Sequence, residues 1–283
     1  MKHYFHFDHI FVINLKHRDD RLEHVKREFQ KLNVPTRVVT QEQFNQTPLF
    51  QGATIVRFEK HPVNGTQGCA TSHQSIYRYA IKHKLDAVLI FEDDVSFELP
   101  EDQLFQKHDF TFPELQSQYT HIYEKLVDGS CDIAFMGYGS HVPFLFRKLA
   151  CPNFDYIEHI WCLHAYAISL KAMKQMDLLI DRVYQLYPEP NALWHIDYMI
   201  SFSPFQKIRA IQKLAWYIVT KSDNPWWKPG EKEPHETHNE TQYGIQNLTQ
   251  SSRVIAVISG FISSSKMILL QNQMKKIYKE LFL

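Results

Sequence analysis

The sequence predicts an α/β protein with a mostly parallel sheet, flanked by helices, and a helical appendage at its C-terminus. Short apolar runs recur along the chain, amphipathic helix patterns separate them, and several runs are apolar at nearly every position. Strands buried on both faces have this composition, and repeated strand–helix order is typical of parallel sheets. With 283 residues, 44% hydrophobic and 14% aromatic, the chain can bury a large core.

The first half of the chain alternates between the two kinds of element. The helix predictions depend on apolar residues at helical spacing, such as Leu22, Val25 and Phe29. The stretch 41–64 is otherwise polar and turn-rich, so we expect mainly a long loop there. The expected strands are His9–Leu15, Arg37–Thr40, Thr54–Phe58 and Asp86–Phe91, and the expected helices are Arg18–Asn33 and Gly68–Lys84.

The second half continues with a helix over Pro113–Val127 and strands at Asp132–Gly137 and Ala165–Ser169, where Ser169 is the expected N-cap of a helix to about Leu186. The composition changes after Lys221. Ser222–Thr241 is rich in proline, tryptophan and charge, and is either a loop that folds over a ligand or a linker. Lys266–Leu283 fits an amphipathic helix that docks on the domain, with an anchor on a membrane surface as the alternative. We therefore divide the chain into a domain at 1–220 and an appendage at 221–283.

Composition excludes several classes of function. Lys+Arg and Asp+Glu balance at 31 each, which argues against nucleic acid as a partner. The four cysteines show no C-x-x-C spacing and are expected to be core thiols in a reducing compartment. No signal peptide and no run long enough to span a bilayer is evident, so we expect a cytoplasmic protein, with peripheral membrane contact through the last helix as the alternative.

Three adjacent carboxylates, Glu92, Asp93 and Asp94, follow the buried strand Asp86–Phe91. Open α/β sheets bind ligands beyond the carboxyl ends of their strands, and crowded carboxylates there repel one another unless a cation or strong donors hold them. We expect Mn²⁺ or Mg²⁺ at this place, with Asp94 as the most direct ligand and Glu92 or Asp93 assisting. A solvated acidic turn is the alternative.

Two further segments carry candidate binding residues. Asn14, Arg18 and Arg21 follow the first strand, where a guanidinium can meet a phosphate or a nucleobase carbonyl and the amide can read a base edge. The alternatives are exposed charges and a turn cap. Ser72 and His73 lie near a helix start whose glycines, Gly65 and Gly68, allow close backbone approach and whose N-terminus favours anions. Alternatively, His73 packs against the sheet and bonds a carbonyl.

Four segments in order resemble glycosyltransferase family 25, which contains bacterial lipooligosaccharide sugar transferases and animal procollagen galactosyltransferases. They are F-V-I-N-L-K-H-R-D-D-R (Phe11–Arg21), G-T-Q-G-C-A-T-S-H (Gly65–His73), V-L-I-F-E-D-D-V (Val88–Val95) and H-A-Y-A-I-S-L-K-A (His164–Ala172), followed by the aspartate of W-H-I-D-Y-M-I (Trp194–Ile200). The resemblance covers roughly two thirds of the chain. It implies a GT-A type, Rossmann-like fold, a nucleotide-sugar donor, a divalent cation and inversion at the anomeric carbon.

The resemblance also sets the expected chemistry. By analogy with the family we expect a UDP-sugar carrying galactose or glucose as the donor and a glycan or protein hydroxyl as the acceptor. Asp93 is assigned to the donor ribose, and Asp197, which matches the family's late aspartate, is the expected base for the acceptor proton. An N-cap or salt-bridge role is the alternative for Asp197. Trp226 and Trp227 are candidates for stacking on acceptor sugars, and His235 or His238 for closing over the metal. An inactive binding or scaffold protein and a phosphoryl- or nucleotidyltransferase are the competing functions.

Overall fold

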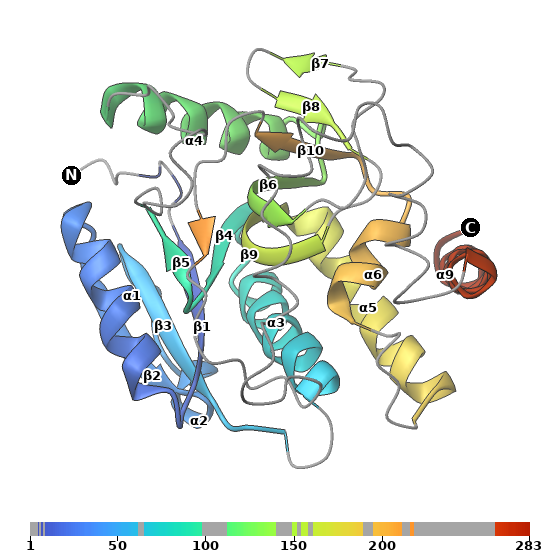
Figure 1. Cartoon of the computed structure of the whole chain (residues 1–283), viewed down its shortest axis with the longest axis horizontal. Coiled ribbons are helices and arrows are strands. Elements are labelled where there is room, and N and C mark those ends of the chain that lie inside the picture. The colour runs from blue at the N-terminus through green and yellow to red at the C-terminus, as the bar shows by residue number, and fades with distance from the viewer. Residues whose placement is uncertain are drawn as a thin grey trace.

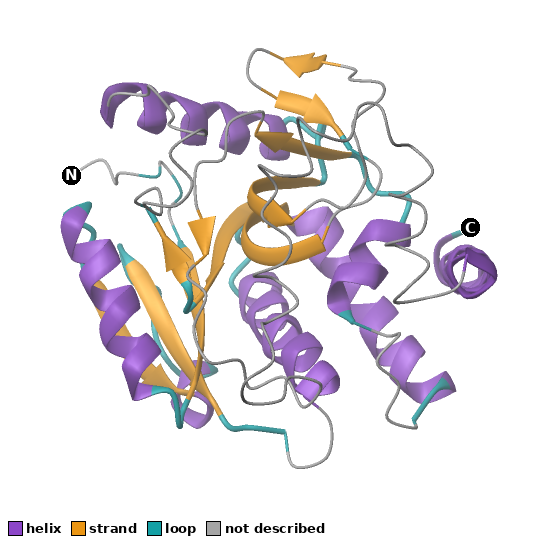
Figure 2. Ribbon diagram, in the orientation of Figure 1, coloured by secondary structure: helices purple, strands orange, loops and turns teal. Residues whose placement is uncertain are grey.

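The computed structural model describes residues 5, 7, 9–61, 65–97, 112–139, 149–151, 154–157, 161–188, 195–210, 216–217 and 264–283. Within these ranges the chain forms a nine-stranded sheet with helices on both faces (Figure 1 and Figure 2). Two more short strands, β5 (Val95–Ser96) and β11 (Trp216–Tyr217), pair with each other. The strands of the large sheet, in spatial order, are β2 (Thr36–Thr40), β3 (Ala53–Phe58), β1 (Ile10–Leu15), β4 (Ala87–Glu92), β9 (Trp161–Ser169), β6 (Ile133–Gly139), β10 (Lys207–Ala210), β8 (Phe154–Tyr156) and β7 (Leu149–Cys151).

The predicted mostly parallel sheet is confirmed. β2, β3, β1 and β4 are parallel neighbours, and β10 is parallel to β6. β9 is antiparallel to both β4 and β6, and β8 is antiparallel to β10 and β7. A parallel connection needs a crossover, usually a helix. The described residues between β6 and β9 hold only β7 and β8, which is consistent with β9 returning in the opposite direction.

The predicted helices agree with the structure to within a few residues, but two short helices, α2 (Gln41–Phe44) and α6 (Ile196–Phe202), were not predicted. Thr40, the N-cap of α2, accepts a hydrogen bond from the backbone N–H of Gln43 in a capping box, inside the stretch predicted as mainly loop. Ser169 caps α5 as predicted, and its hydroxyl accepts from the N–H of Ala172. The helices are α1 (Asp19–Lys31), α2 (Gln41–Phe44), α3 (Gly65–Lys82), α4 (Phe112–Val127), α5 (Leu170–Leu186), α6 (Ile196–Phe202) and α9 (Ser264–Phe282).

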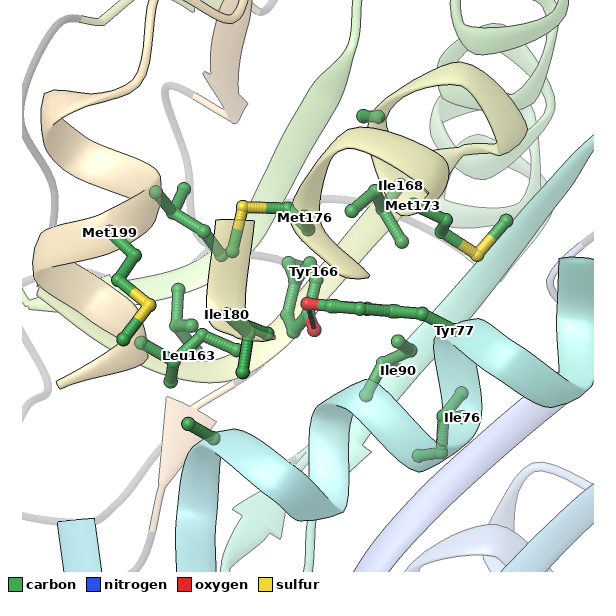
Figure 3. Packing of buried hydrophobic residues seen from close by; sticks show 14 of the residues in the cluster. Ile76, Tyr77, Ile90, Leu163, Tyr166, Ile168, Met173, Met176, Ile180 and Met199 are labelled. Atoms are coloured by element: carbon green, nitrogen blue, oxygen red, sulfur yellow. Dashed lines mark hydrogen bonds between the residues drawn. The ribbon is translucent and has the colours of Figure 1, made fainter. Parts of the chain in front are cut away.

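Two hydrophobic cores lie on opposite faces of the sheet, because successive strand residues point to opposite faces. Val88 and Ile90 of β4 belong to the first core with α3, α5, α6 and α9, part of which Figure 3 shows. Leu89 and Phe91 belong to the second core with α1 and α4. This alternation decides which helix each carboxylate after β4 meets.

The C-terminal helix packs on the domain. Met274 and Ile277 of α9 are 1% and 3% exposed and belong to the first core. The helix contacts α5 and α6, beside which it lies in Figure 1. Two residues of the predicted apolar face of this helix are therefore buried against the domain, as expected for a docked helix. Among the helices described, none combines the length and hydropathy that a bilayer crossing requires.

Candidate active site

The three carboxylates diverge at the end of β4. Glu92 follows the alternation of Val88 and Ile90 and meets α3, where its Oε1 lies 3.4 Å from Nε2 of His73. Asp93 lies toward α1, as the alternation predicts for the residue after Glu92. The sequence alone treats the three acids as one cluster, whereas in the structure Glu92 meets α3, and Asp93 and Asp94 both lie near Arg21 of α1.

Asp93 is buried, with 4% of its surface exposed, and both of its carboxylate oxygens accept hydrogen bonds. The side-chain amide of Asn14, from the end of β1, donates to Oδ2 over 2.7 Å. The guanidinium of Arg21, from α1, donates to Oδ1 over 3.1 Å. Three predicted donor-binding residues therefore form one connected group. Asp93 ties β1, α1 and β4 together.

Asp94 has fewer partners. Its Oδ2 lies 3.6 Å from Nη1 of Arg21, which therefore serves two carboxylates. Its Oδ1 is buried and has no hydrogen-bond partner among the described residues. The same is true of Oδ1 of Asn14, whose amide nitrogen donates to Asp93 and to the carbonyl of Arg18. Buried acceptors normally have hydrogen-bond partners. The region around Asn14 and Asp94 therefore has fewer donors and positive charges than its acceptors require.

The electrostatics of this region agree with that shortage. Partial burial, which leaves 30% of the side chain exposed, raises the pKa of Glu92 to about 8 together with the charges of Asp197 and Asp93. Burial also raises the pKa of Asp94 to about 7 despite the opposing charge of Arg21, and Glu92 and Asp93 add to the rise. Both acids would hold protons near neutral pH unless an added cation stabilised their charged forms.

A divalent cation fits these residues. Glu92 experiences the charges of Asp93 and Asp197, and Asp94 experiences those of Glu92 and Asp93. Arg21 lies 3.1 Å from Asp93 and 3.6 Å from Asp94. Oxygen ligands are those that Mg²⁺ and Mn²⁺ prefer. The unpartnered Oδ1 of Asp94 is an acceptor that such an ion satisfies.

His73 is fully buried, and both ring nitrogens have partners. Its Nδ1 lies 2.7 Å from the hydroxyl of Tyr166, which is itself 2.6 Å from the hydroxyl of Tyr77. Figure 3 shows the two tyrosine hydroxyls meeting above α3. Burial lowers the pKa of His73 to about 4, although the charge of Asp197 opposes the shift. His73 therefore does pack against the sheet, but it bonds a hydroxyl and approaches a carboxylate, and the expected carbonyl partner is wrong.

Arg18 and Ser72 are each engaged locally. Arg18 is 8% exposed, so its alternative as an exposed charge is wrong, and its Nε and Nη2 donate to the carboxylate of Asp20 over 2.9 and 2.8 Å. That fork holds the pKa of Asp20 far below its usual range. The hydroxyl of Ser72 donates over 2.8 Å to the carbonyl of Gly68 within α3.

The glycines at the start of α3 have different surroundings. A Cβ on Gly68 would meet Cβ of His61 at 2.7 Å, so Gly68 permits a close approach within the chain itself. A Cβ on Gly65 would meet nothing within 4 Å. Of the two glycines, only Gly65 therefore has open space beside it in which a sugar donor could approach the backbone.

Asp197 lies in the first turn of α6. The N-cap of that helix is His195, so the alternative of Asp197 as an N-cap is wrong. Its charge acts on both Glu92 and His73, which places it on the same side of the sheet as Glu92. The candidates Trp226, Trp227, His235 and His238 lie outside the described residues.

One face of α1 forms hydrogen bonds with the segment that follows the three carboxylates. These contacts were not predicted from the sequence. A ring nitrogen of His24 lies 2.8 Å from the carbonyl of Val95, and Oε2 of Glu28 accepts from the N–H of Phe97 over 2.8 Å. With Arg21, these residues have the i, i+3, i+7 spacing of one helix face. The only signal in the sequence was the recurrence of polar residues at that spacing, which also fits a solvated face.

Comparison with known proteins identifies the family. The family model described as "Glycosyltransferase family 25 (LPS biosynthesis protein)" matches residues 7–199, more than half of the chain. The chain therefore belongs to glycosyltransferase family 25, a family of sugar transferases. The resemblance predicted from the sequence is confirmed.

Curated relatives match over about a third of the chain. Procollagen galactosyltransferase 1-A of Xenopus laevis is 34% identical over 103 residues, which are 33% of this chain and 17% of that protein. Glycosyltransferase 25 family member of Drosophila melanogaster is 32% identical over 101 residues, 32% of this chain and 16% of that protein. Inactive glycosyltransferase 25 family member 3 of Homo sapiens is 32% identical over 102 residues, 32% of this chain and 17% of that protein. The matched segments are thus a small part of these longer relatives.

Proposed function

We propose that this protein is a metal-dependent, inverting glycosyltransferase that moves galactose or glucose from a UDP-sugar to the hydroxyl of a glycan or protein acceptor. The observation that carries the metal requirement is the buried, unpartnered Oδ1 of Asp94, whose carboxylate experiences the negative charges of Glu92 and Asp93. Membership of the family and the galactosyltransferase among its relatives support the sugar-transfer activity.

The proposed metal ligands are Asp94 and Glu92, which lie at the end of β4. Mn²⁺ or Mg²⁺ held there would neutralise the charge that grows on the departing diphosphate. Arg21 keeps Asp93 and Asp94 in place through its two contacts of 3.1 and 3.6 Å. His73 is proposed to orient Glu92 and not to touch the donor, since both of its ring nitrogens are already engaged.

The nucleotide is proposed to lie at the ends of β1 and β4. The free Oδ1 of Asn14 is an acceptor for an N–H of the base. Arg18 and Arg21 add positive charge near the diphosphate, and Asp93 is assigned to the ribose through the lone pairs that Asn14 and Arg21 leave open. Ser72 contributes by supporting the first turns of α3.

Asp197 is proposed as the base that removes the proton of the acceptor hydroxyl. It comes from α6, on the opposite side of the sheet to α1, and its charge reaches Glu92. Donor and acceptor would then approach from different elements. An inverting displacement needs the base on the face opposite the leaving group, and this separation supports that arrangement.

The experiment compares UDP-galactose and UDP-glucose turnover with Mn²⁺ in the natural chain and in Asp94→Asn. We expect Mn²⁺-dependent release of UDP that Asp94→Asn abolishes. Asp181→Asn is the matched control, because Asp181 is an exposed acid of α5 paired with Arg78, and it should retain turnover. The anomeric configuration of the product, read by NMR, tests inversion.

The alternative is a catalytically inactive member that keeps the fold as a binding or scaffold protein. The inactive human relative favours this alternative. It predicts neither UDP release nor a metal requirement under any donor tested. Failure of both UDP-sugars to bind in the presence of Mn²⁺ would therefore replace the enzymatic proposal with the scaffold.

A further inference from the structure

We propose that Cys69, His73 and Glu92 form a second cation site, which binds a borderline transition metal such as Zn²⁺. This site is separate from the all-oxygen site at Asp94 and shares only Glu92 with it. Cys69 has no assigned role in the proposed function, and it is a free thiol that is partly exposed to solvent.

The geometry assembles three ligand atoms. Sγ of Cys69, a ring nitrogen of His73 and a carboxylate oxygen of Glu92 all lie within 4.8 Å of one another. Cys69 and His73 are four residues apart on α3, so they share one face of the helix. Glu92 comes from the end of β4, 3.4 Å from Nε2 of His73. A helix and a strand that pack together thus bring the three groups to one place.

An independent observation supports a ligating role for His73. A metal-binding histidine almost always bonds its other ring nitrogen to a second group, which fixes the ring. Here Nδ1 is held 2.7 Å from the hydroxyl of Tyr166, and that hydroxyl is held 2.6 Å from Tyr77 (Figure 3). The ring is fully buried, and its Nε2 is left facing Glu92.

The donor set selects the metal. A thiolate, an imidazole and a carboxylate are ligands of Zn²⁺, whereas Mg²⁺ and Mn²⁺ prefer oxygen atoms alone. A bound dication deprotonates a coordinating thiol. Three protein ligands leave one position of a tetrahedral ion open for water or another small ligand. The Glu92 side chain is 30% exposed, so solvent reaches this group.

Because Glu92 is proposed as a ligand of both sites, a metal at Cys69 should affect sugar transfer. This expectation, unlike the binding itself, rests on the proposed function. A metal that draws Glu92 toward Cys69 removes a ligand from the Mn²⁺ site. Zn²⁺ should then inhibit Mn²⁺-dependent turnover, and Cys69→Ser should relieve that inhibition.

The binding test uses no sugar donor, so its failure is distinguishable from failure of the proposed function. The full chain is freed of metal with a chelator and titrated with Co²⁺, whose thiolate complexes absorb in the near ultraviolet. We expect a thiolate band that saturates at a single equivalent and that Zn²⁺ bleaches, since Zn²⁺ binds more tightly. Cys69→Ser should abolish the band. His73→Ala, which removes a direct ligand, should weaken Co²⁺ binding by more than the roughly tenfold that loss of an outer-shell partner costs.

Two controls define the site. Cys131→Ser should keep the band, because Cys131 is a buried free thiol in the other core that bonds the carbonyl of Ile133. Asp94→Asn should also keep it while losing Mn²⁺-dependent turnover. A band that survives Cys69→Ser, or that disappears in Asp94→Asn, would overturn the assignment of a separate site.

A second measurement needs no variant. Zn²⁺ should slow alkylation of Cys69 in the natural chain, as read by peptide mass spectrometry. Equal alkylation rates with and without Zn²⁺, or the absence of any thiolate band with Co²⁺, would show that these three side chains hold no metal.

Discussion

Asn14 donates a 2.7 Å hydrogen bond to Asp93, and this bond joins the ends of the neighbouring strands β1 and β4. The two residues are 79 positions apart in the chain, and both are buried. The bond fixes the carboxylate that Arg21 also holds, so it sets the position of the acidic segment relative to α1. The side-chain oxygen of Asn14, Oδ1, has no partner among the described residues and remains available to a ligand.

Asn14→Ala should therefore weaken both the fold and the donor site. Loss of a buried hydrogen bond to a charged group costs about 1.5–3 kcal/mol, and we expect the free energy of unfolding to fall by about that amount. Urea denaturation measures this change. Asn45→Ala, at an exposed position that ends α2, is the control and should change stability by less than about 0.5 kcal/mol. Equal stability of the two variants would mean that the bond to Asp93 contributes nothing.

Asp197→Asn tests the proposed base. A well-placed general base contributes about 10²–10⁴ in rate, so kcat should fall by about that factor. The affinity for the UDP-sugar should stay nearly unchanged, because Asp197 lies on α6, away from the nucleotide residues of β1 and α1. Steady-state kinetics with both substrates measures the two quantities separately. Full kcat in this variant would place the base on another residue.

Mn²⁺ affinity should depend on pH. The pKa values of Asp94 and Glu92 are raised to about 7 and about 8, so both acids are protonated at pH 6 and must lose protons to bind the ion. Affinity should therefore rise as pH increases from 6 to about 8. Calorimetric titration at several pH values measures it, and a flat profile would contradict the assignment of these two ligands.

The same shifts set the stability of the metal-free chain. An acid with a raised pKa in the folded state binds more protons folded than unfolded between its two pKa values. The free energy of unfolding should therefore fall as pH rises from about 4 to about 8. Added Mn²⁺ should oppose this loss most strongly at the upper end of the range.

Gly68→Ala and Gly65→Ala form a matched pair at the start of α3. A Cβ on Gly68 meets His61 at 2.7 Å, so the chain must shift, and we expect destabilisation of about 1–3 kcal/mol. A Cβ on Gly65 meets nothing, and alanine suits a helix better, so Gly65→Ala should be neutral or stabilising by up to about 1 kcal/mol. Thermal unfolding of both variants checks the order, and the reverse order would be inconsistent with the packing.

The sequence predicted local features well. The N-cap at Ser169 depends on one side chain and its next turn, so periodicity and capping chemistry were enough to find it. The helix α2 carried an equally local signal, the capping box of Thr40 and Gln43, which was obscured by the polar composition of the segment. The continuous apolar runs of β1 and β4 also predicted that these strands would be buried on both faces.

Pairing between distant residues was beyond the sequence. Asn14, Arg21 and Asp93 were each candidates, but nothing in their spacing showed that one carboxylate would join the other two. The hydrogen bonds from His24 and Glu28 to the segment after Asp94 were missed for the same reason. A polar helix face is interpreted as solvent-exposed until the strand that it contacts is known. Likewise, the proximity of Cys69 to Glu92, whose ligand atoms lie within 4.8 Å of each other, depends on how α3 packs on β4.

The most direct test of the account is binding of Mn²⁺ by the natural chain and by Asp94→Asn in the presence of UDP, read by electron paramagnetic resonance of free Mn²⁺. We predict that the natural chain binds Mn²⁺ together with UDP and that Asp94→Asn, folded as judged by circular dichroism, does not. Equal Mn²⁺ binding by the two proteins, or none by either, would contradict the claim that the carboxylates after β4 hold the ion.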